Sequence, residues 1–316
     1  MNILAGIFGL VIIGIILQDA FETIVLPRRV TRKIRLAKLS YRFLWGIWRI
    51  VAKPIRSINR REALLSYFGP LSLILLLALW AVGLIVGFAL LQWALGSRVT
   101  SPDHPVTFWT DLYLSGSTFL TIGYGDVVAV TTLTRLIDVA EGGLGFGFLA
   151  LIIGYVPIIY QAFSRRETNI ALLDAHAGSP PSAEEFLRRH HYNTQEVTDF
   201  LRQWEQWSAE LLESHLSYPV LMYYRSQHDN QSWIATLTAI LDLCALAMSG
   251  IVDMPEEAAR FTFAMARHAA VDLSQVLGTV PSMLPKNRLS AKDFARLQEL
   301  LMESGVLLPQ QEMAEQ

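Results

Sequence analysis

One long uncharged stretch constrains this chain more than any other feature. Between Glu62 and Arg98 no residue carries a charge, and most side chains from Leu64 to Leu95 are apolar. An α-helix needs about 20 residues to cross the hydrocarbon core of a bilayer. The stretch therefore predicts a membrane-spanning helix over 63–96. A mean hydropathy of +0.35 also indicates a membrane protein.

Two further apolar segments, 1–27 and 134–163, are also long enough to span a membrane. Residues 1–27 lack the leading basic residues and the cleavage site of a signal peptide, so we expect them to remain as a helix. Residues 107–120 are too short and too polar to cross, and predict a re-entrant helix. The predicted fold class is an all-α membrane protein with three spans.

Basic residues indicate how the spans are oriented. The segment from Arg28 to Arg61 holds twelve basic residues and no acidic one, and Arg165 and Arg166 follow the third span. Cytoplasmic loops carry such an excess of positive charge. We expect a multi-pass protein of the cell (inner) membrane, with its amino terminus outside and its carboxyl terminus in the cytoplasm.

The basic segment 28–62 has the pattern of an amphipathic helix that lies on anionic membrane lipids. Basic and apolar residues recur at helical spacing on two different faces. The basic face contains Arg35, Lys38, Arg42, Arg49, Lys53 and Arg56, and the apolar face contains Leu36, Leu39, Phe43, Ile47 and Ile50. Arginines do not occur at every third position within a span, so an intrinsic voltage sensor is not expected. The flanking spans argue against nucleic-acid binding.

A Gly-Tyr-Gly-Asp segment directly follows the re-entrant helix. Non-helical backbone at membrane depth occurs only inside protein or along a water-filled path. Gly123 and Gly125 permit backbone angles that aim successive carbonyls at one axis. The carboxyl end of the preceding half-helix carries partial negative charge. Together these features predict the lining of a cation pore.

This part of the chain resembles the potassium-channel family. The resemblance is carried by Thr118 and by the consecutive residues Thr121, Ile122, Gly123, Tyr124, Gly125 and Asp126. It implies a pore domain over 63–163, with outer helix 63–96, pore helix 107–120, filter 121–126 and inner helix 134–163.

The resemblance also implies how the pore works. The carbonyls of Thr121, Ile122, Gly123 and Tyr124, with the Thr121 hydroxyl, would coordinate dehydrated K⁺. The K⁺ is the permeant ion and no cofactor is expected. Four chains close such a pore, so a homotetramer is implied.

Four acidic residues lie within the predicted spans. We expect Asp19 and Glu22 either to pair with the arginines that follow or to contact the pore. Asp138 and Glu141 lie on the extracellular half of the inner helix, and intramembrane acids are candidate functional residues. Our hypothesis is that Glu141 packs behind the filter and bonds a pore-helix group such as Ser117, so that Thr118, Ser117 and Glu141 support the filter.

Three residues of the inner helix are candidates for gating. Gly145 falls where similar channels place a hinge glycine, while Gly154 and Pro157 lie nearer the cytoplasmic end, where Pro157 could kink the helix. The alternative interpretation is that small residues allow close helix packing.

Residues 164–316 predict a helical cytosolic regulatory domain, with 12 basic and 20 acidic residues. Breakers at 178–182 separate a helical continuation from further helices, which we expect at 194–215, 231–250, 255–277 and 290–304. No Gly-x-Gly-x-x-Gly follows a strand pattern. The residues Glu213, His215, His228 and Asp229 could hold a metal, but their spacing matches no compact motif, and buried hydrogen bonds and helix capping are alternatives.

The sequence therefore predicts a channel that conducts K⁺ passively and is gated by an unknown cytosolic ligand, a lipid or a cytosolic-domain signal. The alternatives are a non-selective cation channel and a membrane-anchored binding module with a vestigial pore. An enzyme is not expected, because no arrangement of nucleophile, base and orienting group is apparent.

Overall fold

Three helical segments of this computed structural model are long and apolar enough to cross a membrane: Ile3–Val25, Asn59–Ala94 and Thr132–Ala177. The structure describes residues 3–26, 35–100, 105–190, 194–228, 230–249, 254–279 and 290–303. The chain is an all-α membrane protein and falls into two compact units. One unit combines 1–57 with 67–160, and the other combines 58–66 with 161–316.

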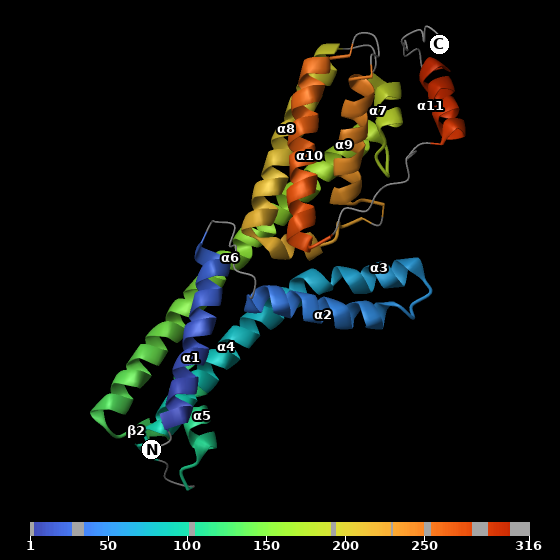
Figure 1. Ribbon diagram of the computed structural model, residues 1–316. Coiled ribbons are helices and arrows are strands. Elements are labelled where there is room, and N and C mark those ends of the chain that lie inside the picture. The colour runs from blue at the N-terminus through green and yellow to red at the C-terminus, as the bar shows by residue number, and fades with distance from the viewer. Residues whose placement is uncertain are drawn as a thin grey trace. The chain divides into compact units, whose positions relative to one another are not determined.

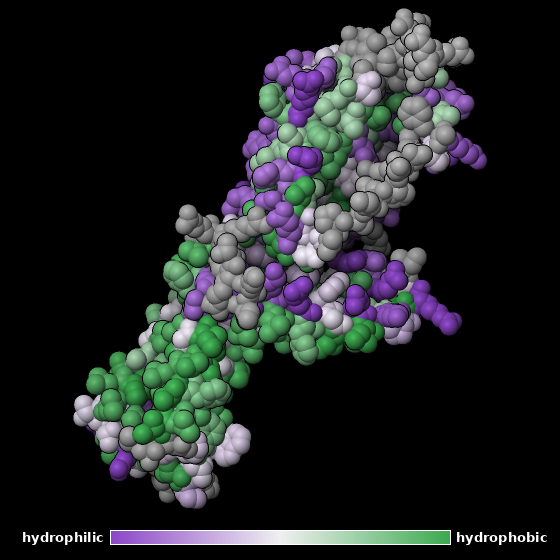
Figure 2. Space-filling view, viewed as in Figure 1, coloured by the Kyte–Doolittle hydropathy of each residue, from purple (hydrophilic) through white to green (hydrophobic). Residues whose placement is uncertain are grey.

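In the first unit, α1 (Ile3–Ala20) packs along α4 (Phe68–Ala94), and one π-helical turn over Phe21–Val25 extends α1 (Figure 1). Glycines allow this approach, since a Cβ on Gly9 would lie 2.6 Å from the carbonyl oxygen of Gly87. Small residues at a helix crossing are typical of packing in lipid. Figure 2 shows the apolar surface over α1.

The segment between α4 and the last span folds into a loop closed by two short strands. β1 (Val99–Thr100) pairs antiparallel with β2 (Val128–Ala129), with Val99 opposite Ala129. Between them lie the short helix α5 (Phe108–Phe119) and the Gly-Tyr-Gly segment. The strand pair, which the sequence analysis did not predict, holds the two ends of this loop together.

The basic segment 28–62 is not one helix. Residues 27–34 lie outside the described part of the chain, α2 (Leu36–Ala52) ends before Pro54, and α3 (Ile58–Ser66) belongs to the second unit. Pro54 has no backbone N–H to donate to the carbonyl of Ile50, which favours the end of the helix at this point. On α2 the predicted apolar face is exposed, including Leu39, Phe43, Ile47 and Ile50.

The last span is longer than the predicted 134–163. Helix α6 covers Thr132–Ala177 and ends at Gly178, which has a φ of +83°. No strong breaker other than Pro157 occurs earlier in α6, and Ile170 and Leu173 are buried in the core of the second unit. The expected helical continuation is therefore part of the folded second unit.

The second unit is a helical bundle around a tryptophan-rich core. Its further helices are α7 (Ala183–His190), α8 (Thr194–Ser217), α9 (Trp233–Ala247), α10 (Glu256–Leu277) and α11 (Ala291–Glu303), with a 3₁₀ turn over Pro219–Tyr223. Figure 1 shows α8 and α10 side by side. These helices confirm the predicted segments, because the apolar residues of each recur at helical spacing and face the core.

The described members of the predicted acidic and histidine cluster are not arranged as a metal site. His215 is buried against Arg166, Glu213 accepts a hydrogen bond from Ser217, and Asp229 lies outside the described residues. Within the described ranges, no group of three or more His, Cys, Asp or Glu side chains is arranged to hold a metal ion. The alternative of buried hydrogen bonding describes His215 correctly.

Candidate functional site

The half-length helix α5 ends where the Gly-Tyr-Gly segment begins. Its 12 residues start after Thr107, which forms a reciprocal cap with Thr110. Asp111 in the first turn accepts a hydrogen bond from Ser97 and adds a favourable negative charge near the helix amino terminus. The carboxyl end, with its partial negative charge, leads directly into residues 121–126.

The backbone of the filter segment alternates between two conformations. Thr121, Gly123 and Gly125 have φ values of 56°, 60° and 78°, whereas Ile122 and Tyr124 do not adopt positive φ. In an ordinary strand successive carbonyls point in opposite directions. Alternating left-handed residues instead turn successive carbonyls toward the same side, as a carbonyl-lined ion path requires. Thr121 adopts this conformation despite its branched Cβ, which disfavours it.

The last turn of α5 anchors the start of the filter segment. The Thr121 N–H donates to the Thr118 carbonyl at 3.0 Å, and the Ile122 N–H donates to the Ser117 carbonyl at 2.8 Å. The Gly123 N–H also donates to the Ser117 carbonyl at 3.3 Å, while Ile122 and Tyr124 are 50% and 71% exposed in a single chain. One chain therefore builds one wall of the candidate ion path.

A hydrogen bond that the sequence analysis missed holds the carboxyl-terminal end of the segment 121–126. The Tyr113 hydroxyl on α5 donates to the Asp126 carboxylate, with distances of 3.0 and 3.2 Å to its two oxygens. The two residues are 13 positions apart and belong to different elements. No local pattern could have indicated this pair.

Glu141 contacts the pore helix, but not through the predicted residue. Its carboxyl group lies within hydrogen-bond distance of the Ser115 hydroxyl, which also lies 2.7 Å from the carbonyl oxygen of Ile85. The Ser117 hydroxyl instead donates to Leu114 within α5. Successive side chains of a helix point in different directions around its axis. Ser117 is two positions after Ser115 and therefore lies on a different face of α5 from the one that meets Glu141.

The other acid of the inner helix, Asp138, joins α6 to α4. The Gln92 side-chain amide donates to the Asp138 carboxylate at 2.6 Å and to the Thr134 carbonyl at 3.3 Å. Gln92 is fully buried. A buried polar side chain in a span is stabilised only when it finds such partners.

Gly145 lies against the backbone at the carboxyl end of α5. A Cβ at this position would overlap the backbone carbonyl of Phe119, and one at Gly142 would lie 3.7 Å from the Thr118 Cγ2. Helix α6 runs without a break through Gly145, Gly154 and Pro157. The close-packing interpretation accounts for Gly145 in this structure, and a gating role for these three residues stays a prediction.

The comparison with known families agrees with this geometry. Residues 74–162 match a family model described as Ion channel. No curated protein and no solved structure matches the chain significantly. The matched residues include most of α4, all of α5 and the filter segment, and the part of α6 that carries Glu141 and Gly145. This match supports an ion channel pore domain over residues 74–162 and favours ion conduction over catalysis.

Proposed function

We propose that this protein is a potassium-selective channel in which four identical chains surround one ion path. The observation that carries the proposal is the alternation of positive φ at Thr121, Gly123 and Gly125. Carbonyls turned to one side can replace the hydration shell of K⁺ when four such segments face one another. The ligands would be the carbonyls of Thr121 to Tyr124 and the Thr121 hydroxyl.

The exposure of α6 supports assembly of several chains. The most apolar window of α6 is 17% buried within one chain, against 33% for the first span and 44% for the second. Large side chains such as Val139, Phe146 and Ile153 are exposed along it. In a closed cyclic tetramer the inner helices face the ion path and the neighbouring chains, which would cover this surface.

Helix α2 supports contact with the cytoplasmic leaflet. Its apolar residues Leu39 and Phe43 are exposed, and each directly follows an exposed basic residue, Lys38 or Arg42. A helix of this kind lies in the headgroup region of anionic lipids. In the proposed orientation the second unit is cytosolic and the membrane is the cell (inner) membrane.

Flux and reversal potentials test the proposal. The purified full-length chain would be reconstituted into liposomes of neutral lipid and of neutral plus anionic lipid, with K⁺ on one side and Na⁺ on the other. We expect a reversal potential that follows the K⁺ gradient, and higher flux with anionic lipid. The variant Gly123→Ala places a Cβ on a positive-φ residue and should abolish selective flux.

Two other outcomes have defined meanings. Equal permeability to K⁺ and Na⁺ would replace the proposal with a non-selective cation channel. Absence of flux in every lipid, at every pH and with every added metal would favour a membrane-anchored binding module. The mass of the detergent-solubilised assembly, measured by light scattering, decides separately whether four chains associate.

A further inference from the structure

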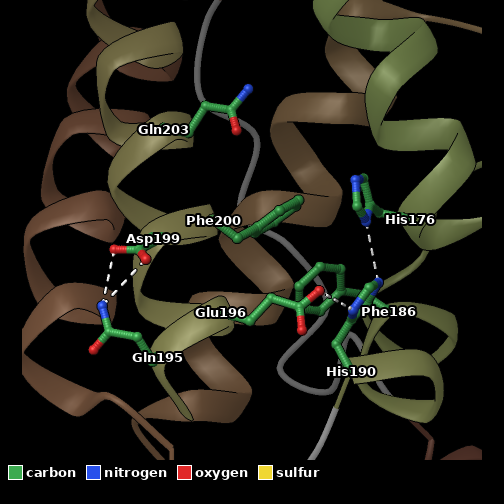
Figure 3. A pocket seen from close by; sticks show the side chains of 8 residues that line it. All are labelled: His176, Phe186, His190, Gln195, Glu196, Asp199, Phe200 and Gln203. Carbon is green, nitrogen blue, oxygen red and sulfur yellow. Dashed lines mark hydrogen bonds and ion pairs between the residues drawn. The ribbon is translucent and has the colours of Figure 1, made fainter. Parts of the chain in front are cut away.

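The second unit contains an open cavity of about 510 Å³ whose wall includes two histidines. His176 lies in the last turn of α6, His190 is the last residue of α7, and Glu196 lies in the first turn of α8. Figure 3 shows the three side chains pointing toward one another at the edge of the cavity. They are outside the pore domain, and neither the matched family model nor the proposed conduction uses them.

The hydrogen bonds assign the state of one imidazole. His190 Nδ1 lies 3.1 Å from a Glu196 carboxylate oxygen, and His190 Nε2 lies 3.1 Å from His176 Nδ1. An ionised carboxylate can only accept, so His190 Nδ1 carries the proton. In neutral His190 the Nε2 lone pair therefore points at His176.

Aromatic packing holds both rings in place. The centroids of Phe186 and His190 are 4.8 Å apart, those of His176 and Phe200 are 5.7 Å apart, and those of Phe186 and Phe200 are 4.2 Å apart. The two imidazoles are thus positioned by the core of the unit.

We propose that His176 Nδ1 and His190 Nε2 bind one divalent transition-metal ion of the zinc type. Zinc–nitrogen bonds are about 2.0–2.1 Å long, so two ligand nitrogens at right or tetrahedral angles lie about 2.8 to 3.4 Å apart. The observed 3.1 Å lies within that range. On binding, the ion takes the place of the proton on His176 Nδ1, and that proton passes through solvent to His176 Nε2, so both imidazoles stay neutral.

Glu196 takes the place of the carboxylate that commonly orients a metal-binding histidine. A ligating imidazole usually donates its other N–H to a carboxylate or carbonyl, which fixes its tautomer and raises its basicity. No third side chain of the described part of the chain completes a metal cluster here, so water fills the remaining positions. The open cavity, with Asp199 on its wall, leaves room for these waters.

Metal titration of the full-length chain in detergent, with any affinity tag removed, tests this site. Calorimetry with Zn²⁺ should show one ion bound per chain, and Co²⁺ should report nitrogen ligation in its visible spectrum. We expect His176→Gln and His190→Gln each to weaken Zn²⁺ binding at least tenfold, and Glu196→Gln to weaken it about tenfold.

His268→Gln is the matched control, because His268 is a solvent-exposed histidine on α10 that does not line the cavity. Its Zn²⁺ affinity should equal that of the wild type. The proposal is overturned if the wild type binds Zn²⁺ no more tightly than the His176→Gln, His190→Gln double variant. It is also overturned if the single variants bind as the wild type does. Neither result depends on K⁺ flux, so this test is separate from that of the channel.

Discussion

Single buried carboxylates link helices within the first unit. Asp19 is fully buried and accepts hydrogen bonds from Trp80 Nε1 and from the Ala37 N–H, both at 3.0 Å. It thereby joins α1 to α4 and satisfies one N–H in the first turn of α2. Glu22 pairs with Arg35, as expected. At this depth each acid depends on specific partners, because lipid offers none.

Removing the Ser115 hydroxyl should disturb the filter, whereas removing that of Ser117 should not. Ser115→Ala leaves the Glu141 carboxyl without its hydrogen-bond partner on α5, at a cost of about 1–3 kcal/mol. We expect faster inactivation or weaker K⁺ selectivity in liposome recordings, and a lower melting temperature in detergent. Glu141→Gln should alter the same properties.

Ser117→Ala is the matched control, because within the described part of the chain this hydroxyl donates only to the Leu114 carbonyl in its own helix turn. Its backbone carbonyl, which receives the Ile122 N–H, is unchanged. Equal effects of the two serine substitutions would contradict a specific role for the Ser115–Glu141 contact.

At the scale of elements, close helix approach depends on glycine. Gly9 and Gly87 bring α1 against α4, and Gly145 brings α6 against the carboxyl end of α5. A methyl group at such a crossing meets backbone atoms, which cannot rotate away as a side-chain end can. Helices of the same hydropathy that lacked these glycines could not bring their backbones so close together.

Gly145→Ala should therefore impair conduction more than Gly147→Ala. The new methyl group would push on the Phe119 carbonyl, two residues before the filter, with an overpacking cost of about 1–3 kcal/mol. Nothing lies within 4 Å of a Cβ built at Gly147 in one chain. We expect lost or non-selective flux for the first variant and near-normal flux for the second. Normal selective flux through Gly145→Ala would show that the helices can separate at no cost to the filter.

On the scale of the whole molecule, one buried cation joins α6 to the core of the second unit. Arg166 donates to the Leu221 carbonyl at 3.1 Å and to the Tyr224 carbonyl at 2.8 Å, and lies 3.1 Å from His215 Nε2. Since Arg166 can only donate, His215 Nε2 accepts, while Nδ1 lies 2.8 Å from the Leu211 carbonyl and carries the proton. Burial, and next the charge of Arg166, lower the pKa of His215 to about 3.

This histidine predicts how stability changes with pH. The ordinary pKa of 6.5 applies in the unfolded chain and about 3 in the folded chain. As the pH falls below 6.5, the unfolded chain takes up a proton that the folded chain does not. The contribution of His215 to the free energy of unfolding is complete above pH 6.5. It is lost as the pH falls from 6.5 to 3, by up to about 1.4 kcal/mol per pH unit.

Thermal unfolding of the detergent-solubilised chain, followed by the fluorescence of buried tryptophans such as Trp204, measures this effect. We expect the loss of stability between pH 7 and pH 5 to be smaller in His215→Gln, whose amide oxygen can still accept from Arg166 without titrating. His268→Gln should keep the wild-type pH dependence. An identical pH dependence in wild type and His215→Gln would show that other groups cause it.

The helical spans could be predicted from sequence because their signals are local, and the filter stays a prediction that rests on an equally local motif. Hydropathy over 20 residues identifies a span, helical periodicity identified α8 to α11, and the Gly-Tyr-Gly segment indicated a carbonyl-lined path. The end of α2 at Pro54 and the end of α6 at Gly178 are equally local signals. Spans, helical periodicity and helix ends depend on residues that are close together in the sequence, so the sequence alone can indicate them.

Only the tertiary structure decided which distant groups meet. Trp80 is 61 positions from Asp19, Ser115 rather than Ser117 faces Glu141, and the Tyr113–Asp126 bond joins two elements. Each pair depends on helix rotation and on how closely two backbones approach, which is a property of packing between elements. The sequence by itself determined three spans and predicted a carbonyl-lined segment after a half-length helix. Packing determined which residues contact that segment and what brings His176 to His190.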